Sequence, residues 1–343
     1  MTLHPPIDAL FASPPPDLSD DEAASLARSY YGLQGALTRL TSERDLNFLL
    51  VTTDASYVLK LANPAEPALI TNFQTMALLH LQTTAPHLAV PRVIPSLTGA
   101  SETALPQGML RLLSYLPGMM LHAAPPGPGL RRAIAREAAR LALGLGTFRH
   151  PAASHVLLWD IKQAASLRPL LGAIADPARQ VQAAHWLDRF AAEIAPRLPQ
   201  CRCQVVHGDL NPHNLLVYPA NPGQICGILD FGDMVETPLI CDLAIAASYQ
   251  IDPAQPLQSL AEMAGAYHAV LPLAATELDL LPALIITRMI TTLAITAARA
   301  DRYPENAAYI LRNLATSLQG LDALTALPAK ATRAAILHAC APE

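Results

Sequence analysis

Short runs of alternating apolar and polar residues dominate the first third of the chain. A period of two residues is typical of strands with one buried face, and short polar connections between such runs favour antiparallel pairing. The clearest runs of this kind are residues 36–40, 47–52 and 57–61, followed by strand-like segments at 90–94 and 109–113. This part of the chain is therefore predicted to form a small antiparallel sheet.

Two helices are expected beside this sheet. Ser19 is followed three positions later by Glu22, which is the spacing of a capping box, and a helix is predicted over about residues 20–30. A second helix is predicted over residues 70–81, where apolar side chains recur at intervals of three and four. The first third is thus expected to be a sheet that carries one main helix, with a further helix at its start.

After about Ser114 the chain becomes rich in Ala and Leu, and helical periodicity replaces alternation. The long periodic segments are residues 131–145, 179–198, 257–271 and 280–300. One interruption, residues 204–231, contains two β-like runs around a turn of Pro, Asn and Gly. The composition shift predicts an N-terminal lobe over residues 1–113 and a mostly helical C-terminal lobe over residues 114–343.

Composition narrows the class of protein. Of 343 residues, 52% are hydrophobic and 15% are charged, which predicts a folded protein with a large core. The formal net charge of −5 argues against general binding to nucleic acid or to anionic membranes. The five cysteines are odd in number and show no Cys-x-x-Cys spacing, which favours a reducing compartment. Prolines within the first 16 residues would interrupt the apolar core of a signal peptide, so a cytoplasmic protein is expected and not a secreted one. Residues 280–300 resemble a membrane span, but Arg288 at their centre favours a buried helix instead.

The candidate chemistry lies in the interruption of the helical region. His207-Gly-Asp-Leu-Asn-Pro-His-Asn214 places Asp209 five residues before Asn214, and Ile228-Leu-Asp-Phe-Gly232 brings in Asp230 shortly afterwards. Phosphoryl transfer requires a carboxylate that orients the attacking hydroxyl and oxygen ligands that hold a divalent metal at the phosphates. These residues supply both. The competing interpretation is a polar turn between two buried segments, because turns often contain Asn and Asp.

These motifs resemble those of the aminoglycoside phosphotransferase and choline kinase superfamily, whose catalytic loop reads His-x-Asp-x-x-x-x-Asn. Within it, the chain is more similar to hydroxylysine kinase-like proteins, on the blocks Ser42-Glu-Arg-Asp-Leu-Asn-Phe48, Gly227-Ile-Leu-Asp-Phe-Gly-Asp-Met234 and Tyr303-Pro-Glu-Asn306. The resemblance implies an α+β, protein-kinase-like fold of two lobes. It also implies that Asp209 is the catalytic base, that Asn214 and Asp230 hold Mg²⁺, and that His207 shapes the loop.

A phosphate-binding lysine is expected on the third strand, where kinases place theirs, and Lys60 occupies that position. The alternative for Lys60 is an exposed strand residue. Protein kinases hold this lysine with a glutamate from the next helix, but residues 69–81 contain no Glu. Gln74 is nearest to the expected place, and Glu66 is a possible substitute.

The remaining nucleotide contacts are expected from loops. No Gly-x-Gly-x-x-Gly sequence precedes Lys60, so backbone N–H groups and the side chains of Ser42 and Arg44 are the candidates for phosphate binding. For Arg44, an ordinary exposed turn residue is an equal alternative. The segment 111–118 resembles the linker between lobes, in which the backbone of Ser114 and Leu116 would meet the purine. Backbone contacts do not distinguish ATP from GTP.

The acceptor side is less defined by the sequence. Carboxylates for an amino group are expected among Asp233, Glu236 and Asp160, whereas Arg288 is the candidate for an acceptor carboxylate. The alternative for Arg288 is an internal ion pair with a residue such as Asp301 or Asp242, since burying an unpaired arginine is costly. Asp242 is itself expected to brace the catalytic loop through a backbone N–H near His207.

The resemblance implies transfer of the γ-phosphoryl group of ATP or GTP, with Mg²⁺, to a hydroxyl of a small amino-containing acceptor. The first candidate is 5-hydroxylysine, followed by homoserine, other amino alcohols and aminoglycosides. Two alternatives stay open, a nucleotide-binding pseudokinase that regulates a partner and an enzyme that transfers a nucleotidyl group to protein. A monomer or a homodimer is expected, with neither nucleic acid nor membrane as a partner.

Overall fold

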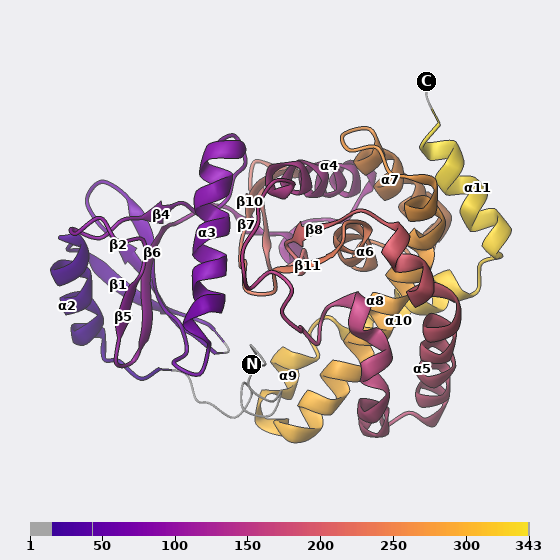
Figure 1. Cartoon of the computed structure of the whole chain (residues 1–343), viewed down its shortest axis with the longest axis horizontal. Coiled ribbons are helices and arrows are strands. Elements are labelled where there is room, and N and C mark those ends of the chain that lie inside the picture. The colour runs from indigo at the N-terminus through magenta and orange to yellow at the C-terminus, as the bar shows by residue number, and fades with distance from the viewer. Residues whose placement is uncertain (1–15, 43, 342–343) are drawn as a thin grey trace. The chain divides into compact units, whose positions relative to one another are not determined.

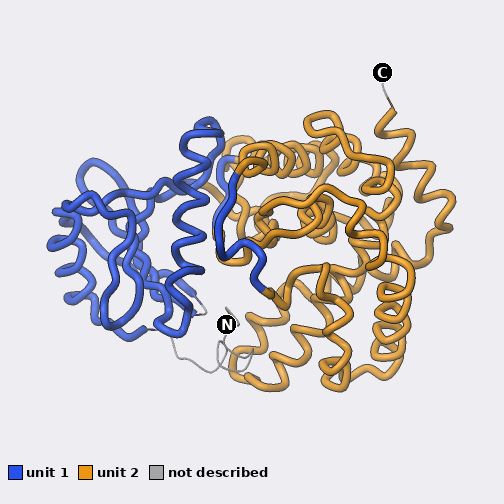
Figure 2. The backbone as a smooth tube through the Cα atoms, viewed as in Figure 1, with its two compact units in different colours: residues 1–117, 148–155, 226–229 blue, residues 118–147, 156–225, 230–343 orange. Residues whose placement is uncertain are grey.

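The computed structural model describes residues 16–42 and 44–341, which form two compact units (Figure 2). Unit 1 contains the described residues up to Pro117 together with Phe148–His155 and Cys226–Leu229, and unit 2 contains the rest. The two later segments of unit 1 lie beyond the boundary that the composition places near residue 114. Two segments used in the sequence analysis lie outside the described residues. They are Glu43, which belongs to the block 42–48, and the proline-rich start of the chain, on which the expectation of a cytoplasmic protein depends.

Unit 1 is built on an antiparallel sheet with the strand order β1-β2-β3-β6-β4, in which β5 also pairs with β6. Its strands are β1 (Ala36–Leu40), β2 (Leu46–Val51), β3 (Ser56–Leu61), β4 (Val93–Ile94), β5 (Thr103–Leu105) and β6 (Gly108–Ser114). The three strands predicted from alternation are thus confirmed, with Leu46 opposite Leu61 and Val51 opposite Ser56 in the central hairpin. Only Val93 and Ile94 of the expected strand 90–94 are paired with β6, because Pro91 lacks the N–H that a ladder requires.

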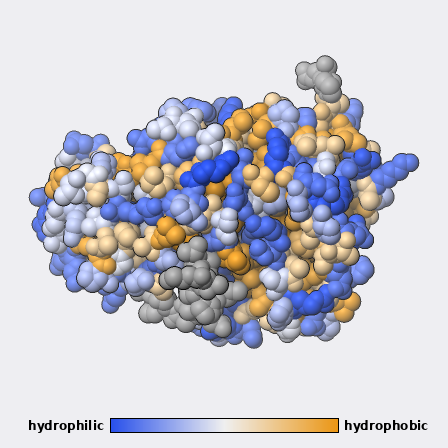
Figure 3. Space-filling model, viewed as in Figure 1, coloured by the Kyte–Doolittle hydropathy of each residue, from blue (hydrophilic) through white to orange (hydrophobic). Residues whose placement is uncertain are grey.

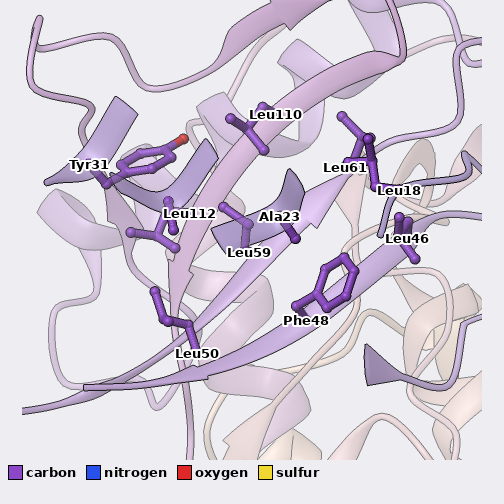
Figure 4. Close-up of a cluster of buried hydrophobic side chains, with 11 residues drawn as sticks. Leu18, Ala23, Tyr31, Leu46, Phe48, Leu50, Leu59, Leu61, Leu110 and Leu112 are labelled. Atoms are coloured by element: carbon purple, nitrogen blue, oxygen red, sulfur yellow. The ribbon is translucent and has the colours of Figure 1, made fainter. Parts of the chain in front are cut away.

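One face of this sheet carries the apolar core of unit 1. Alternate residues of neighbouring strands point to the same side, and on this side Phe48, Leu59 and Leu112 belong to one buried cluster with Tyr31 (Figure 4). Tyr31 belongs to α2 (Asp20–Tyr31), whose first turn has the predicted capping box. Ser19 N–H donates to Glu22 at 2.8 Å, and Glu22 N–H donates back to the Ser19 hydroxyl at 3.3 Å. The helix therefore begins where the sequence indicates, and it packs on the apolar face of the sheet.

The opposite face of the sheet carries two basic side chains and lies against α3 (Ala68–Thr84) (Figure 1). Lys60 and Arg111 are directly opposite each other on β3 and β6, so both side chains point to this side. Arg111 is buried and donates to Gln74 Oε1 at 3.0 Å and to the Thr75 hydroxyl at 3.3 Å, both on α3. The sheet therefore presents its apolar core to α2, and it presents Lys60 and Arg111, beside the apolar pair Val58 and Leu113, to α3.

Unit 2 is mostly helical. Its α-helices are α4 (Pro128–Leu145), α5 (Pro177–Arg189), α6 (Ile240–Ser248), α7 (Pro256–His268), α8 (Ala275–Arg302), α9 (Ala307–Ile310), α10 (Leu314–Thr325) and α11 (Ala329–Ala339). The 3₁₀ helices are η1 (Leu121–Ala123), η2 (Ile161–Ala173), η4 (Ala195–Gln200) and η5 (Pro304–Asn306), and η3 (Phe190–Ile194) is a π-helix. The predicted helix 179–198 ends its α-helical part at Arg189, and Pro196 and Pro199 then force the tighter turn of η4.

The helix α8 forms the centre of unit 2 and packs against α6, α10 and η2. Among the described residues it is the one helix long and apolar enough to cross a membrane, but 83% of its most apolar window is buried inside the protein. Hydrophilic and hydrophobic residues are interspersed on the face of the molecule in Figure 3. The burial of α8 agrees with the expectation that residues 280–300 form a core helix.

Two short sheets interrupt the helices of unit 2. One has the order β10-β9-β7 and consists of β7 (Met119–Met120), β9 (Leu215–Tyr218) and β10 (Asn221–Ile228). The other pairs β8 (Cys203–Val206) antiparallel with β11 (Val235–Pro238), with Val206 opposite Val235. Because β8 ends where β11 begins, the loop that follows Val206 and the loop that precedes Val235 lie at the same end of this pair.

The start of α8 is fixed by a buried carboxylate. Glu277 is fully buried, accepts from Ala274 N–H at 2.8 Å, and pairs with Arg202 at 2.6 Å. Burial opposes its ionised form, but the hydrogen bonds from Arg202 and Ala274 and the guanidinium charge outweigh burial and lower the pKa of Glu277. The ionised carboxylate therefore stabilises the fold.

Glu277→Gln is expected to lower the free energy of unfolding at pH 7 by about 1–3 kcal/mol, because it removes the charge from a buried hydrogen-bonded pair. Since the folded pKa lies below the usual 4.5, the advantage of the wild type is complete above that pH and declines as the pH falls through the lowered value. Urea unfolding of both proteins between pH 3 and 7 measures this. Asp279→Asn, which breaks a partly exposed pair with Arg333, is the control and should cost under about 1 kcal/mol.

Candidate active site

The loop after β8 makes a turn that requires glycine. Gly208 has φ +80°, and a Cβ at this position would lie 2.2 Å from the carbonyl oxygen of Asp233. An L-residue avoids this backbone region, and the approach leaves no room for a side chain. The loop 207–214 and the segment before β11 are therefore in direct backbone contact at Gly208 and Asp233.

A buried carboxylate on α6 supports the same turn. Asp242 Oδ1 accepts from Gly208 N–H at 2.9 Å, which confirms the predicted brace. Burial raises the pKa of Asp242, and the His207 imidazole and the amides of Gly208 and His207 act in the opposite direction. His207 is completely buried, packs edge-on against Phe231 at 4.9 Å between ring centroids, and accepts from Asp209 N–H at 3.2 Å. These contacts support a scaffold role for His207.

The Asp209 carboxylate is held by three side-chain donors. Its Oδ2 accepts from the amides of Asn211 at 2.7 Å and Asn214 at 2.8 Å, and its Oδ1 accepts from Arg288 at 3.1 Å. The side chain is still 20% exposed. Asp209 and Asn214, which the motif predicts to act together, are thus in direct contact. Asn211 was not singled out from the sequence, although it lies inside the same motif.

The oxygen donors of the loop suit a divalent cation. Asn214 uses its Nδ2 for Asp209, so its Oδ1 is the atom available to a metal. Asp230 is exposed and has φ +56°, which makes it the single residue other than glycine with positive φ in the described part of the chain. Its Oδ1 accepts from Gly232 N–H at 3.1 Å, and this turn fixes the carboxylate. Carboxylate and amide oxygens are the ligands that Mg²⁺ prefers, so both residues fit the predicted role.

The partner of Lys60 is neither of the residues considered from the sequence. Lys60 Nζ lies 2.8 Å from Oδ2 of Asp45, whose Oδ1 accepts from Asn63 N–H at 3.1 Å. Burial would raise the pKa of Asp45, but the Lys60 ammonium, with the hydrogen bonds from Lys60 and Asn63, lowers it. Asp45 follows directly on the turn that was expected to bind phosphate, so it supplies the negative charge that residues 69–81 lack.

The expected partners of Lys60 have other contacts in unit 1. Gln74 accepts from Arg111, and Glu66 pairs with Arg44 at 2.9 Å. The expectation that Gln74 orients Lys60 is therefore wrong, because the neighbouring Arg111 takes its amide oxygen. Arg44 is 36% exposed at its side chain and pairs with the more buried Glu66, and its role in phosphate binding stays a prediction.

The other nucleotide candidates lie at the ends of strands in unit 1. Ser42 follows β1 and is half-buried, and Leu116 follows β6. Ser114 ends β6, where its N–H donates to the Arg92 carbonyl at 2.8 Å and its hydroxyl accepts from Arg92 N–H at 2.9 Å. The roles of Ser42, Ser114 and Leu116 in nucleotide binding stay predictions.

Of the three carboxylates expected near an acceptor amine, one has an internal role. Asp160 is buried, caps η2 through Lys162 N–H at 3.1 Å, and accepts from the Thr237 hydroxyl at 2.7 Å. These internal contacts occupy the Asp160 carboxylate and do not support substrate binding. Asp233 and Glu236 are half-buried, and Asp233 lies next to Gly208 of the catalytic loop. Their roles stay predictions.

Arg288 forms an internal ion pair, which was the alternative to binding an acceptor carboxylate. Its partner is Asp209, and not Asp301 or Asp242 as expected. It also donates to the Trp159 carbonyl at 3.0 Å and to the Tyr249 hydroxyl at 3.3 Å. The residue proposed for an acceptor carboxylate is therefore engaged by the candidate base. Neither Trp159 nor Tyr249 was assigned a role from the sequence.

Lys60→Met is expected to lower kcat/KM for the nucleotide by about 10–100-fold, because a charge-assisted contact to phosphate is worth about 1.5–3 kcal/mol. Steady-state rates at varied nucleotide concentration measure this. Lys330→Met removes an exposed lysine of α11 and serves as the control. An unchanged nucleotide KM and kcat in Lys60→Met would exclude the phosphate-binding role.

Comparison with known proteins defines the class to which this fold and site belong. The model of the phosphotransferase enzyme family (APH) matches residues 36–280. The chain belongs to this family, and it is a small-molecule kinase that phosphorylates a hydroxyl group.

Among the individual relatives, the chain is 30% identical to hydroxylysine kinase of Bos taurus, with 92% of each protein covered. It is 29% identical to hydroxylysine kinase of Danio rerio, over 91% of this chain and 92% of that protein. Among solved structures, amicoumacin kinase superposes with a TM-score of 0.64 at 16% identity, over 91% of this chain and 95% of the other. A microcompartment-associated aminopropanol kinase superposes with a TM-score of 0.61 at 18% identity, over 88% and 99%. The predicted kinase-like α+β fold is confirmed by these superpositions.

Proposed function

We propose that this protein transfers the γ-phosphoryl group of a nucleoside triphosphate to the side-chain hydroxyl of 5-hydroxylysine. The observation that carries the proposal is the similarity to hydroxylysine kinases over more than nine-tenths of the chain. Homoserine, another amino alcohol or an aminoglycoside are the alternatives within the same reaction class.

The arrangement around Asp209 supports this chemistry. A carboxylate oxygen has two lone pairs, and Oδ2 of Asp209 accepts two amide donors, whereas Oδ1 accepts one from Arg288. One lone pair of Oδ1 is thus free to accept the proton of the acceptor hydroxyl. As that proton leaves, a bond forms between the hydroxyl oxygen and the γ-phosphorus, the bond to the bridging oxygen breaks, and the nucleoside diphosphate departs.

The proposal assigns roles to three further side chains. In unit 1, Lys60 is the proposed phosphate ligand, and in unit 2, Asn214 and Asp230 would hold Mg²⁺. The metal, when bound, neutralises charge on the phosphates. ATP and GTP are both candidate donors, because the segment proposed to meet the base offers backbone atoms.

The acceptor is tested with purified protein, MgATP or MgGTP, and a panel of 5-hydroxylysine, homoserine, choline, ethanolamine and an aminoglycoside. Lysine is the matched control compound, since it differs from 5-hydroxylysine by the hydroxyl alone. We expect nucleoside diphosphate release that requires 5-hydroxylysine, with phosphohydroxylysine identified by mass spectrometry. Turnover of another panel member would replace the acceptor, and nucleotide binding without turnover of any would favour a regulatory pseudokinase. A nucleotidyl adduct on the protein would instead indicate nucleotidyl transfer.

We also propose a cytoplasmic location. All five cysteines are free thiols, which supports a reducing compartment. Fractionation of the source cells with an antibody to the chain tests this, and recovery outside the cytoplasm would contradict it.

A further inference from the structure

The middle of α8 contains a buried cation with an unusual set of partners. The Arg288 side chain is 2% exposed in a helix segment whose other residues near it are uncharged. Its guanidinium lies over the Trp159 ring at 4.9 Å from the centroid and donates to the carbonyl of the same residue at 3.0 Å. A second nitrogen meets the Tyr249 hydroxyl at 3.3 Å and Asp209 Oδ1 at 3.1 Å. One guanidinium therefore contacts the residues just before η2 and just after α6 as well as the loop that contains Asp209.

Burial of an arginine is costly unless its charge is compensated. Asp209 is the carboxylate that compensates it, and the nearby Asp233 contributes further negative charge that favours the protonated guanidinium. Trp159 and Tyr249 fix the plane and position of the group, because each contacts it from a different element. The arginine is thus a rigid fixture of unit 2, and a flexible lysine at this position lacks the planar fork that makes these contacts.

The contact with Arg288 restricts the orientation of the Asp209 carboxylate. Asn211 and Asn214 occupy both lone pairs of Oδ2. Arg288 occupies one lone pair of Oδ1, and three donors from two directions prevent rotation of the carboxylate. Without the arginine, Oδ1 has no side-chain donor among these three, and the carboxylate can turn about its Cβ–Cγ bond so that the lone pairs of Oδ1 no longer keep one direction.

We infer that Arg288 is a positioning residue for phosphoryl transfer, which holds Asp209 so that the free lone pair of Oδ1 faces the acceptor hydroxyl. This inference rests on the proposed function of Asp209 as the base. It also implies that the carboxylate of an amino-acid acceptor is bound by a group other than Arg288, because the guanidinium is already paired inside the protein.

The test uses the full chain with the acceptor that the panel identifies. Arg288→Ala is expected to lower kcat by about 10²-fold, since misplacement of a reacting group by about 1 Å has an effect of that size, with little change in either KM. Added guanidinium chloride at concentrations below those that unfold the protein should restore part of the lost kcat. Arg288→Lys retains the charge but not the fork, and its kcat is expected to lie between those of Arg288→Ala and the wild type.

Arg131→Ala is the matched control for loss of a buried arginine. Arg131 is buried on α4 and pairs with Glu262 at 2.6 Å, so its removal destabilises unit 2 without touching Asp209. It should retain kcat and show no response to guanidinium.

A wild-type kcat in Arg288→Ala would overturn the inference while leaving the proposed function intact. If Arg288→Ala and Arg131→Ala lost the same fraction of kcat, and guanidinium restored neither, the role of Arg288 would be purely structural. That result would also overturn the inference. A wild type that phosphorylates no acceptor would contradict the proposed function, and the role of Arg288 with it.

Discussion

Asp209→Asn is expected to reduce turnover about 10³-fold, the middle of the range for loss of a general base. The amide has nearly the shape of the carboxylate, but it has one acceptor oxygen where the site has donors on both sides. Asn211 and Asn214 approach one oxygen and Arg288 approaches the other, so the new amide nitrogen must face a donor in either orientation. The variant therefore loses both the proton acceptor and the fixed geometry.

Turnover is measured by coupled detection of nucleoside diphosphate, and nucleotide affinity by titration calorimetry. Nucleotide affinity is expected to be retained, because the substitution leaves Lys60, the predicted phosphate ligand, unchanged. Asp188→Asn, at a side chain that is 69% exposed, controls for loss of a single negative charge. If Asp209→Asn retained more than about a tenth of the wild-type kcat, the assignment of Asp209 as the base would be wrong, since that loss is below the usual range.

Gly208→Ala is expected to have the second-largest effect, although the substitution adds a single methyl group. The new Cβ would lie 2.2 Å from the Asp233 carbonyl oxygen, and the residue would have to adopt φ +80°. Strained backbone of this kind costs about 1–3 kcal/mol, and the loop must move to relieve the contact. Because Asp209 is the next residue, we expect kcat to fall at least about 10²-fold.

Steady-state kinetics measure the loss of kcat, and thermal unfolding of the same preparations measures the loss of stability from the strained backbone. Gly172→Ala is the matched control, because a Cβ on this exposed glycine of η2 meets no atom within 4 Å. An alanine at position 208 that leaves both kcat and the melting temperature unchanged would show that the loop is not held against Asp233 in solution.

Local patterns in the sequence were sufficient to predict much of the fold. Alternation gave the strands of the central hairpin because their period of two matches the two chemically different faces of one sheet. The Ser19–Glu22 capping box located the first helix because both hydrogen bonds form within one turn. The prediction was poorer where proline intervenes, as in the helix that changes at Phe190 and in the strand shortened after Pro91.

In the candidate site too, contacts within one loop were predicted from the sequence, and contacts between distant segments were not. The spacing from Asp209 to Asn214 was readable because both belong to one loop, and the brace from Asp242 followed from the high energy of a buried carboxylate. The partners of Lys60 and Arg288 were missed. Asp45 reaches Lys60 across a strand pair, and Asp209 reaches Arg288 through the packing of α8, and neither contact has a signature in the spacing of residues.

The pairing of Asp209 with Arg288 has a consequence for co-translational folding of the chain. Arg288 follows Asp209 by 79 residues, so the loop motif is translated long before the guanidinium that holds its carboxylate. At about 5–20 residues per second, roughly 4–16 s separate the synthesis of the two residues. A nascent chain thus carries the Asp209 loop for several seconds before the arginine that holds Oδ1 of Asp209, and that contact can form only after α8 has emerged and packed.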